Sequence, residues 1–466
     1  MKHKKIYVSF ILAFIMIFSI FTVSCSENGA EDESKDNNTT NTNGENVSVT
    51  SDGESGNVSE EVSKTPSDDT SSEETIPEDK RVHFVACPDN IIHTSLMYDA
   101  IDYAAKLNGK EPDSSDLHNA EYDFSYIYTD VKDMIKNADI SYLNQETLIG
   151  GTYGDIGGWP YFNSPQAVAD EDIELGFDVI NVAHNHMLDS FEYINGKRYP
   201  CVNYLKHCSE MFMDKGVTVI GYYPDEESTN IIPVIEKNGI KIAFLSYTYG
   251  TNNHVLPEDS PFVIPYFSKE LVTKQVKLAK QISDFIIVSC HWGHENTYKQ
   301  NSMQKEYAQL LTDLEVDVAL GMHSHSIQPI EWQVKENGHR TLVIYSLGNF
   351  VSGMEQAINM LGLIMQFDIV KDGVTNEVRL ENVEAVPIVT HINKRFRGFH
   401  IYYLSDYTEE LAKVHRVNSY ESAHGSTLIG GKFSKENLVN TLTTVIDSEF
   451  LPEEFKNLNP AEESSK

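Results

Sequence analysis

Between residues 81 and 390 the chain alternates short apolar runs with amphipathic stretches, and this alternation restricts its fold more than any other feature. The first run, residues 82–87, has the length and side chains of a buried strand, and a helical pattern follows it at 94–107. Similar runs predict strands at 140–143, 178–183, 217–220, 285–290 and 318–320. Amphipathic patterns predict helices at 124–136, 165–175, 202–215, 269–282 and 303–314. This order predicts a layered α/β fold, with a central mixed sheet flanked by helices.

Antiparallel strands are expected to extend that sheet. Two apolar runs, 231–236 and 240–246, are joined through Asn238-Gly239, a pair that favours a tight hairpin. Later runs predict further antiparallel strands at 330–335, 341–345, 361–370 and 377–387.

The N-terminal 25 residues have the pattern of a targeting segment. A lysine-rich start precedes an apolar run from Ile6 to Val23, and Cys25 follows almost at once. This pattern predicts a signal peptide that ends in a lipobox, in which Cys25 is lipidated and anchors the chain to a membrane. A plain signal peptide or an uncleaved anchor with an incidental cysteine are the alternatives. All three readings place the rest of the chain outside the cytoplasm.

Residues 26–80 differ in composition from the rest of the chain. This stretch holds 16 acidic residues against three lysines, a net charge of −13, and it has no Phe, Tyr or Trp. Such a segment cannot bury enough apolar surface to offset its ordering entropy, so we expect a disordered spacer. The folded part is then expected to be one domain, residues 81–390, with a C-terminal extension, 391–466, that packs on the domain or is partly flexible.

The charge of the whole chain excludes one class of function. A net charge of −34 leaves no basic face for phosphate backbones, so we expect no nucleic-acid partner. The cysteines form no CxxC pair, which argues against a zinc knuckle.

Metal-ligating residue types follow five of the predicted strands. Each strand exit delivers Asp, Glu, Asn or His, and the residues are Asp89, Glu146, Asn185, His291, His323 and His325. Functional residues of α/β sheets gather beyond the carboxyl ends of the strands, so these side chains are expected to converge on one edge of one sheet. Neutral imidazoles, carboxylates and an amide oxygen suit divalent Mn, Zn or Fe. Two such ions, bridged by a carboxylate, could activate water for a displacement.

These residues lie in a series of motifs that resembles the CapA family of capsule and poly-γ-glutamate biosynthesis proteins. The motifs are Pro88-Asp89-Asn90-Ile91-Ile92-His93, Asn144-Gln145-Glu146-Thr147, Asn185-His186-x-x-Asp189, His291-Trp292-Gly293-x-Glu295, Gly321-x-His323-x-His325-x-x-Gln328-Pro329 and Tyr345-Ser346-Leu347-Gly348-Asn349-Phe350. The resemblance covers about residues 81–390, and a weaker resemblance continues at 405–415. It implies a calcineurin-like metallophosphatase fold and a place outside the cytoplasm. It also implies a role in the synthesis, anchoring or release of a capsule or poly-γ-glutamate.

Three positions depart from the expected patterns. Pro88 stands where the family has Gly, and His184 stands where it often has Asn. Pro88 fixes φ and removes a backbone donor, which puts the geometry at Asp89 in question. The wider superfamily has a His two residues after the first Asp, where this chain has Ile91. His93 or Glu295 could compensate for that missing ligand.

The residues and the resemblance together give a site hypothesis. Asp89 and His325 would hold one metal, Asn185, His291 and His323 the other, and Glu146 would bridge. His323 and His325 are two residues apart, so on an extended stretch their side chains would point the same way. His186 would be the general acid, oriented by Asp189. Asn90, His93, Asn144, His184 and Glu295 are expected around these ligands.

Two classes of function remain open. The first is a metal-dependent hydrolase or transferase that acts on a phosphoester or on an amide-linked cell-surface polymer such as poly-γ-glutamate. The second is a non-catalytic anchor or export subunit that keeps the fold. In either case the expected partners are the polymer or its synthesis complex, and the membrane through the lipid.

Overall fold

The computed structural model describes residues 77–419 and 428–458. The predicted signal peptide, Cys25 and nearly all of the predicted spacer lie outside the described residues. In the described part, none of the helices combines the length and the apolar character that crossing a membrane requires.

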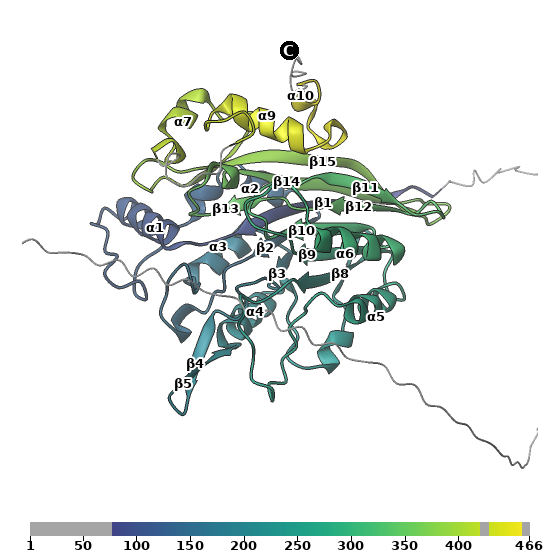
Figure 1. Cartoon of the computed structure of the whole chain (residues 1–466), viewed down its shortest axis with the longest axis horizontal. Helices are drawn as coiled ribbons and strands as arrows, with labels where there is room; N and C mark the ends of the chain where they lie inside the picture. Colours follow the sequence, from purple (N-terminus) through teal and green to yellow (C-terminus); the bar gives the residue numbers. More distant parts are fainter. Residues whose placement is uncertain (1–76, 420–427, 459–466) are drawn as a thin grey trace, which may run out of the picture. The chain divides into compact units, whose positions relative to one another are not determined.

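The first sheet of the described region has eight strands in the order β16-β15-β14-β1-β2-β3-β6, with β13 also paired to β1 (Figure 1). β1, β2, β3 and β6 run parallel, while β14, β15 and β16 continue the sheet antiparallel from the other side of β1. The bounds are β1 Lys80–Asn90, β2 Ile140–Gln145, β3 Val179–Asn181, β6 Thr218–Ile220, β13 Asn349–Val351, β14 Leu361–Lys371, β15 Val378–His391 and β16 His400–Tyr403.

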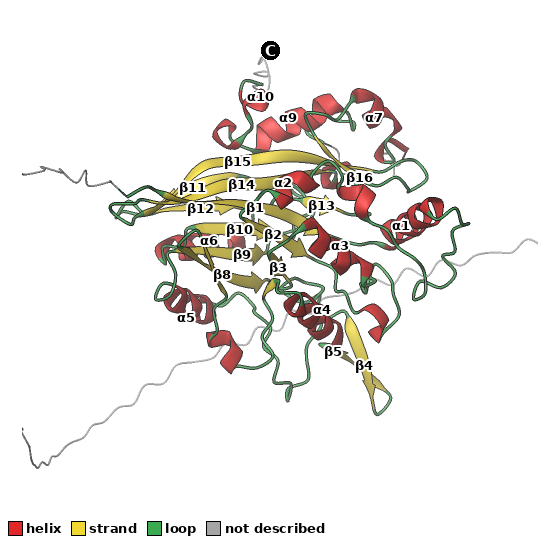
Figure 2. Ribbon diagram, turned by 180° about the vertical axis from the view of Figure 1, so that it is seen from behind, coloured by secondary structure: helices red, strands yellow, loops and turns green. Residues whose placement is uncertain are grey.

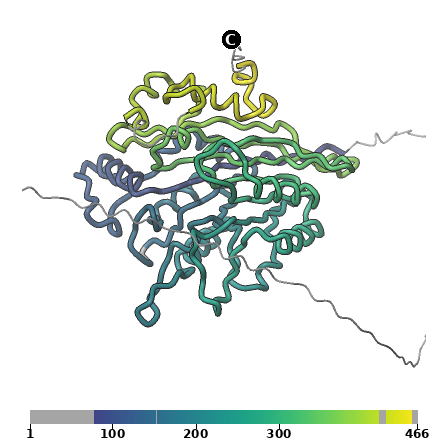
Figure 3. Tube along the Cα trace, in the orientation of Figure 1, coloured from purple at the N-terminus to yellow at the C-terminus, as the bar shows by residue number. Residues whose placement is uncertain are grey.

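The second sheet has six strands among the described residues, in the order β11-β12-β10-β9-β8-β7. Its four middle strands, β8, β9, β10 and β12, run parallel, and β7 and β11 are antiparallel edges. The bounds are β7 Val234–Lys237, β8 Ile240–Thr248, β9 Phe285–His291, β10 Val318–Met322, β11 Ile330–Val334 and β12 Arg340–Ile344. A separate hairpin, β4 Ser190–Ile194 with β5 Lys197–Cys201, projects from the body of the domain as the blue-green loop in Figure 3.

Helices cover the outer faces of the sheets. Figure 2 shows α5 and α6 beside the second sheet, and α7, α9 and α10 over the β14–β15 side of the first sheet. The α-helices are α1 Thr94–Leu107, α2 Lys132–Lys136, α3 Ala167–Leu175, α4 Asn203–Asp214, α5 Lys269–Ala279, α6 Ser302–Asp313, α7 Glu409–Val414, α9 Lys435–Val445 and α10 Glu453–Lys456. Short 3-10 helices occur at Ser125–Tyr128, Gly151–Tyr153, Glu227–Asn230, Ala357–Asn359 and Ser448–Phe450.

The two sheets pack face to face through buried aromatic side chains. Phe84 of β1 stacks on Phe244 of β8 with ring centroids 6.2 Å apart, and Phe367, its paired residue on β14, lies 5.0 Å from Phe84. Each such side chain contributes about 1.5–3 kcal/mol by leaving water. Tyr142 of β2 and Ser289 of β9 also share a buried hydrogen bond of 2.7 Å between the sheets. These contacts fix the strand ends of one sheet against those of the other.

The predicted mixed α/β fold with a mixed central β-structure flanked by helices is confirmed, and the described strands divide between two large sheets. Apolar periodicity reports that a run is buried and does not report which strand it pairs with. The pattern also missed β13 and the β4–β5 hairpin, which are short or exposed. The predicted helix 124–136 is instead a 3-10 turn followed by the short α2.

Local signals were more reliable. Helix α1 has the predicted bounds, Thr94–Leu107. Asn238 and Gly239, with φ of 52° and 75°, form the predicted tight turn between β7 and β8. Both φ values are positive, as a two-residue turn of this kind requires.

Candidate metal centre

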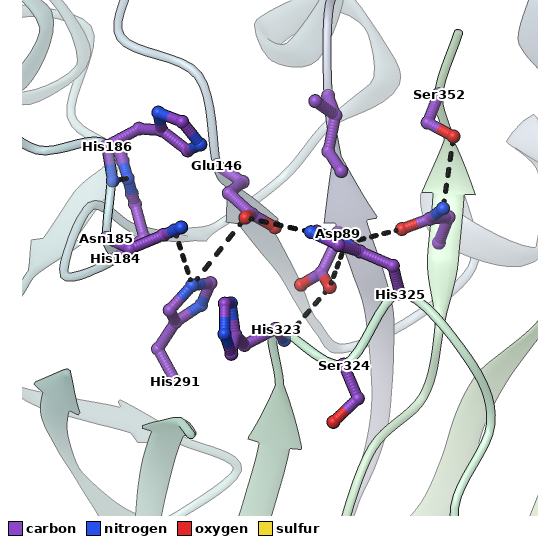
Figure 4. Close-up of polar contacts among 12 residues, drawn as sticks. Asp89, Glu146, His184, Asn185, His186, His291, His323, Ser324, His325 and Ser352 are labelled. Atoms are coloured by element: carbon purple, nitrogen blue, oxygen red, sulfur yellow. Dashed lines mark hydrogen bonds and ion pairs between the residues drawn. The ribbon is translucent and has the colours of Figure 1, made fainter. Parts of the chain in front are cut away.

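Five strand exits converge on one buried site, and they come from both sheets (Figure 4). Asp89, Glu146 and Asn185 follow or end β1, β2 and β3 of the first sheet. His291 ends β9, and His323 directly follows β10 of the second sheet. The expected convergence therefore occurs, but between two sheets and not along one edge of a single sheet. The parallel strands of each sheet point their carboxyl ends at the same space, which brings the side chains together.

Glu146 lies at the centre of this site. Its carboxylate belongs to two groups of ligand atoms, one with His323 and His325 and one with Asp89 and His291, and within each group all atoms lie within 4.8 Å of one another. Both Glu146 oxygens are buried and accept no hydrogen bond. The nearest ring nitrogens, those of His291 and His325, are 3.6 and 3.5 Å from Oε1. A buried carboxylate without partners is costly, so these residues fit a divalent cation that both groups share.

The histidines of the second sheet are in the form that binds metals. Burial lowers the pKa of His291 and of His323 well below the ordinary value, and neighbouring histidines lower both further, so the rings are neutral. The Nδ1 atoms of both rings are buried and have no hydrogen-bond partner. Asn185 completes this side of the site, with its Oδ1 3.0 Å from His291 Nε2. Neutral imidazole with a free lone pair is the ligating species.

His325 is held differently. Burial alone would lower the pKa of His325, but the Glu146 and Asp89 carboxylates outweigh it and raise the pKa to about 10. Its Nδ1 lies 3.0 Å from Asn349 Oδ1. The Asn349 amide nitrogen donates to Ser352 Oγ at 3.0 Å, which fixes the orientation of the amide. His325 Nδ1 therefore donates to Asn349, and Nε2 is the atom that faces Glu146.

The His-x-His segment is not extended, so the reason given for its geometry from the sequence is wrong. His323 and His325 have φ of 90° and 51°. Residues other than Gly rarely adopt this left-handed region of backbone conformation. Asn359 donates to the backbone oxygen of His325 at 2.9 Å, and the Ser326 hydroxyl donates to the Ser324 oxygen at 3.0 Å. Backbone strain of this kind persists where surrounding contacts determine it, and it occurs often at functional sites.

A chain of amides orients Asp89. The Asn144 side chain donates to Asp89 Oδ1 at 2.6 Å, Asn181 donates to Asn144 at 2.6 Å, and Ser246 of the second sheet donates to Asn181 at 2.5 Å. The other Asp89 oxygen accepts the His323 backbone N–H at 3.0 Å. The β1–β2 register shifts between Cys87 and Asp89, so Pro88 lies at an irregularity of the strand. A bulge accommodates the missing backbone donor, and Asp89 still reaches the site.

His186 lies beside these residues and pairs with Asp189. Its Nδ1 is 2.7 Å from Asp189 Oδ2, and that oxygen also accepts the Phe162 backbone N–H at 2.9 Å. The Asp189 side chain is fully buried, whereas His186 keeps 12% of its side chain exposed. Asn252 bridges the pair to the ligand set, because it contacts His186 Nδ1 at 3.3 Å and accepts from Asn185 at 3.2 Å.

An open cleft of about 260 Å³ adjoins the site. Asn185, His186 and Glu295 line it on the side of the metal-ligating residues, and the remaining lining residues are Trp159, Pro160, Tyr161, Asn252 and His254. A substrate bound in this cleft would contact both His186 and Asn185.

Other predicted neighbours have different surroundings. Asn90 hydrogen-bonds to Gln145 and Tyr128, away from the ligands. His93 Nδ1 accepts the Gly353 N–H at 3.1 Å, and His93 belongs to neither ligand group, so it does not replace the histidine missing at Ile91. His184 Nδ1 accepts the His186 backbone N–H at 3.1 Å, and its Nε2 is buried without a partner.

Four residues that touch the site were not singled out by sequence reasoning: Asn181, Ser246, Asn252 and Asn349. Asn349 lies in the last motif of the resemblance, and that motif is the sequence feature that could have identified it as a site residue. Asn181 and Ser246 lie within predicted apolar strands, where a single polar residue carries little information.

Several solved structures superpose on this chain with low sequence identity. A novel phosphatase from Mycoplasma pneumoniae is 14% identical, with 66% of this chain and 94% of that one covered and a TM-score of 0.36. A calcineurin-like phosphoesterase from Bacillus subtilis is 10% identical, with 79% and 97% covered and a TM-score of 0.34.

Curated relatives give a sequence-level match. The poly-γ-glutamate (PGA) biosynthesis protein CapA of Bacillus subtilis (strain 168) is 27% identical over 202 residues, which are 43% of this chain and 49% of that protein. The capsule biosynthesis protein CapA of Bacillus anthracis is 27% identical over 183 residues, 38% of this chain and 41% of that protein. The chain thus spans about half the length of the relatives it matches. The family model of the bacterial capsule synthesis protein PGA_cap matches residues 84–354, well over half of the chain, and this protein therefore belongs to that family.

Proposed function

We propose that this protein is a metal-dependent hydrolase that acts on a capsule or poly-γ-glutamate polymer at the cell surface. One observation carries the proposal: both oxygens of the buried Glu146 carboxylate lack a hydrogen bond, and two groups of potential ligands share them. A purely structural carboxylate in this position would be paired with donors of the chain. Membership of the capsule synthesis family supports the polymer as the substrate class.

The residues that would hold the ions all surround Glu146. The sequence predicts Asp89 and His325 on one ion and Asn185, His291 and His323 on the other, whereas the ligand atoms group His323 with His325 and Asp89 with His291. Either division leaves Glu146 in common, with Mn, Zn or Fe as the candidates. When bound, such ions lower the pKa of water and neutralise the charge that develops on the reacting group. Asn144 and Asn349 keep Asp89 and His325 in their orientations, so the ligand atoms are placed in advance.

His186 would supply the proton for the leaving group. Its Nδ1–H donates to Asp189, which leaves Nε2 as the atom that can exchange a proton in the cleft. The buried Asp189 carboxylate contacts His186 Nδ1 at 2.7 Å and fixes the rotation of the ring. A His–Asp pair outside the ligand groups is what an acid catalyst needs and a polymer anchor does not.

A defined assay tests this function. The full chain, loaded with Mn, Zn or Fe in turn, is incubated with poly-γ-glutamate and with a generic phosphodiester, and metal content is measured by elemental analysis. We expect two ions per chain and a fall in polymer length. A chain that binds no metal and leaves both substrates intact would contradict the proposal and favour a non-catalytic anchor or export subunit.

We also propose that the protein is a lipid-anchored, extracytoplasmic protein. The basic start, the apolar run and Cys25 support this, and they lie outside the described residues. Cys25→Ala is expected to move the protein from the membrane fraction to the soluble fraction. If the variant stays in the membrane at the wild-type level, the apolar run itself is the anchor and the lipobox prediction is wrong.

A further inference from the structure

If the substrate is a polyanion, electrostatic repulsion opposes its binding in the cleft beside His186. The chain carries a net charge of −34, and Glu295 lines the cleft itself. A chain of carboxylates would be repelled from such a protein unless a cation lies along its path. A polyanionic substrate therefore requires a positive group near the cleft that is not already paired with a carboxylate.

Arg198 of the β4–β5 hairpin is such a group. Its guanidinium lies 3.5 Å from the centre of the Phe191 ring and 4.6 Å from that of Tyr161. Tyr161 and His254 line the cleft, and both rings pack against Phe191, with centroids 4.9 and 5.0 Å away. The guanidinium is thus held against aromatic rings, and one of them, Tyr161, lines the cleft.

The environment of Arg198 differs from that of the paired arginines. Arg81, Arg379 and Arg397 each bind a carboxylate at 2.6–2.8 Å. Arg198 forms no ion pair with any residue that the structure describes, although the chain has many more acidic than basic residues. Its positive charge also lowers the pKa of the neighbouring His254, in addition to the larger effect of burial. The hydrogen-bonding edge of the guanidinium is therefore available to an external oxyanion.

Aromatic side chains also line the cleft. Trp159 is 75% exposed and Tyr161 is 41% exposed, so two large rings face solvent beside the proposed acid. Exposed aromatic surface next to a reactive site commonly contacts a ligand. A polymer chain could lie across these rings, with the bond to be cleaved near His186 and an anionic group near Arg198.

We propose that Arg198 forms a carboxylate subsite, and that it makes this protein select a carboxylate-rich polymer over a neutral one. The inference rests on the proposed function, because it assumes that the cleft beside the metal-ligating residues receives the substrate. It assigns to the β4–β5 hairpin the role of a specificity element.

Binding of two matched oligomers tests the subsite. The probes are γ-linked tetraglutamate with free α-carboxylates and the same oligomer with α-carboxamides, titrated calorimetrically into the metal-loaded full chain. We expect the wild type to prefer the carboxylate form, and Arg198→Gln to lose about three- to tenfold in affinity for that form only, as fits one partly exposed charge-assisted contact. Arg198→Lys should lose less, because it keeps the charge without the bidentate geometry.

Arg340→Gln is the matched control. Arg340 also stacks on an aromatic ring, that of Trp332 at 4.1 Å, but it lies on β12, and Trp332, unlike Tyr161, does not line the cleft. It should bind both oligomers as the wild type does. If Arg198→Gln and Arg340→Gln behave alike, or if the wild type binds neither oligomer, the subsite is overturned. A charge preference that depends on Arg198, without cleavage of either oligomer, would retain the subsite and count against hydrolysis.

Discussion

Two groups of buried histidines in this protein differ in how their ring nitrogens are satisfied. In the metal-ligating group, the Nδ1 atoms of His291 and His323 have no partner. In a second group, His391 and His415, which we term the C-terminal histidine pair, the contacts are internal. His415 donates from Nε2 to the Thr390 oxygen and accepts the Val417 N–H on Nδ1, both at 3.1 Å. His391 Nδ1 contacts the Tyr407 hydroxyl at 2.9 Å.

The difference separates a site from a structural contact. Burial lowers the pKa of histidines in both groups, so burial alone does not distinguish them. In the C-terminal histidine pair, both nitrogens of His415 and the Nδ1 of His391 have partners within the fold. The metal-ligating group and Glu146 leave buried atoms that only an external partner can satisfy. Unsatisfied buried ring nitrogens thus separate these two histidine groups.

The largest expected effect comes from His186, which lies beside the metal-ligating group without belonging to it. His186→Ala should lower turnover by about 100- to 10,000-fold, the usual range for a positioned proton donor. Metal content, measured by elemental analysis, should stay at the wild-type level. A variant that loses metal together with activity would make His186 a ligand and remove the proposed acid.

The next effect tests the two histidine groups directly. His323→Ala and His325→Ala should each weaken metal binding by about 100-fold or more, since even supporting residues around such sites cost 10- to 100-fold. His391→Ala removes an equally buried ring and should keep full metal content. Competition with a chelator of known affinity measures the difference. Full occupancy in both His323→Ala and His325→Ala would show that the His-x-His segment is structural and the two-metal interpretation is wrong.

The C-terminal histidine pair should make stability depend on pH. The folded-state pKa values of about 4 for His391 and about 3 for His415 lie below the ordinary 6.5. The unfolded chain therefore binds protons that the folded chain excludes, and stability is lost as the pH falls below 6.5. Between pH 7 and 5, His415 should contribute a loss of about 2 kcal/mol.

Denaturant unfolding of His415→Gln and of the wild type, both saturated with metal, checks this. The wild type should be the more stable at pH 7, and the gap between the two should narrow by about 2 kcal/mol at pH 5. An equal gap at both pH values would mean that His415 is protonated in the folded protein.

The smallest effect is expected at Asp189. Asp189→Asn keeps an oxygen that can accept from His186 Nδ1 but loses the negative charge. Turnover should fall by about tenfold, less than in His186→Ala, and metal content should not change. Steady-state turnover and elemental analysis of Asp189→Asn and His186→Ala, measured side by side, check both expectations. A loss equal to that of His186→Ala would make the charge, and not the orientation, decisive.

Much of the molecule could be predicted from the sequence because the signals are local. Helix α1 and the Asn238-Gly239 turn follow from periodicity and turn chemistry over a few residues. The metal-ligating residue types were found because each follows a recognisable apolar run, and the structure brings Asp89, Glu146, Asn185, His291, His323 and His325 together. Their individual roles as ligands, bridge or acid stay predictions.

Tertiary structure decided what depends on pairing between distant strands. The sequence by itself determined that His323 and Glu146 end up near carboxyl ends of strands, since apolar patterning places those ends. Only the packing of two sheets decided that they face each other, that Ser246 reaches Asn181 across the interface, and that Asn349 meets His325. The left-handed backbone at His323 and His325 is equally a product of the surroundings, because no local preference of histidine selects φ of 90° and 51°. Strand patterns encode burial at a range of a few residues, whereas side-chain partners separated by dozens or hundreds of residues exist only once the sheets have assembled.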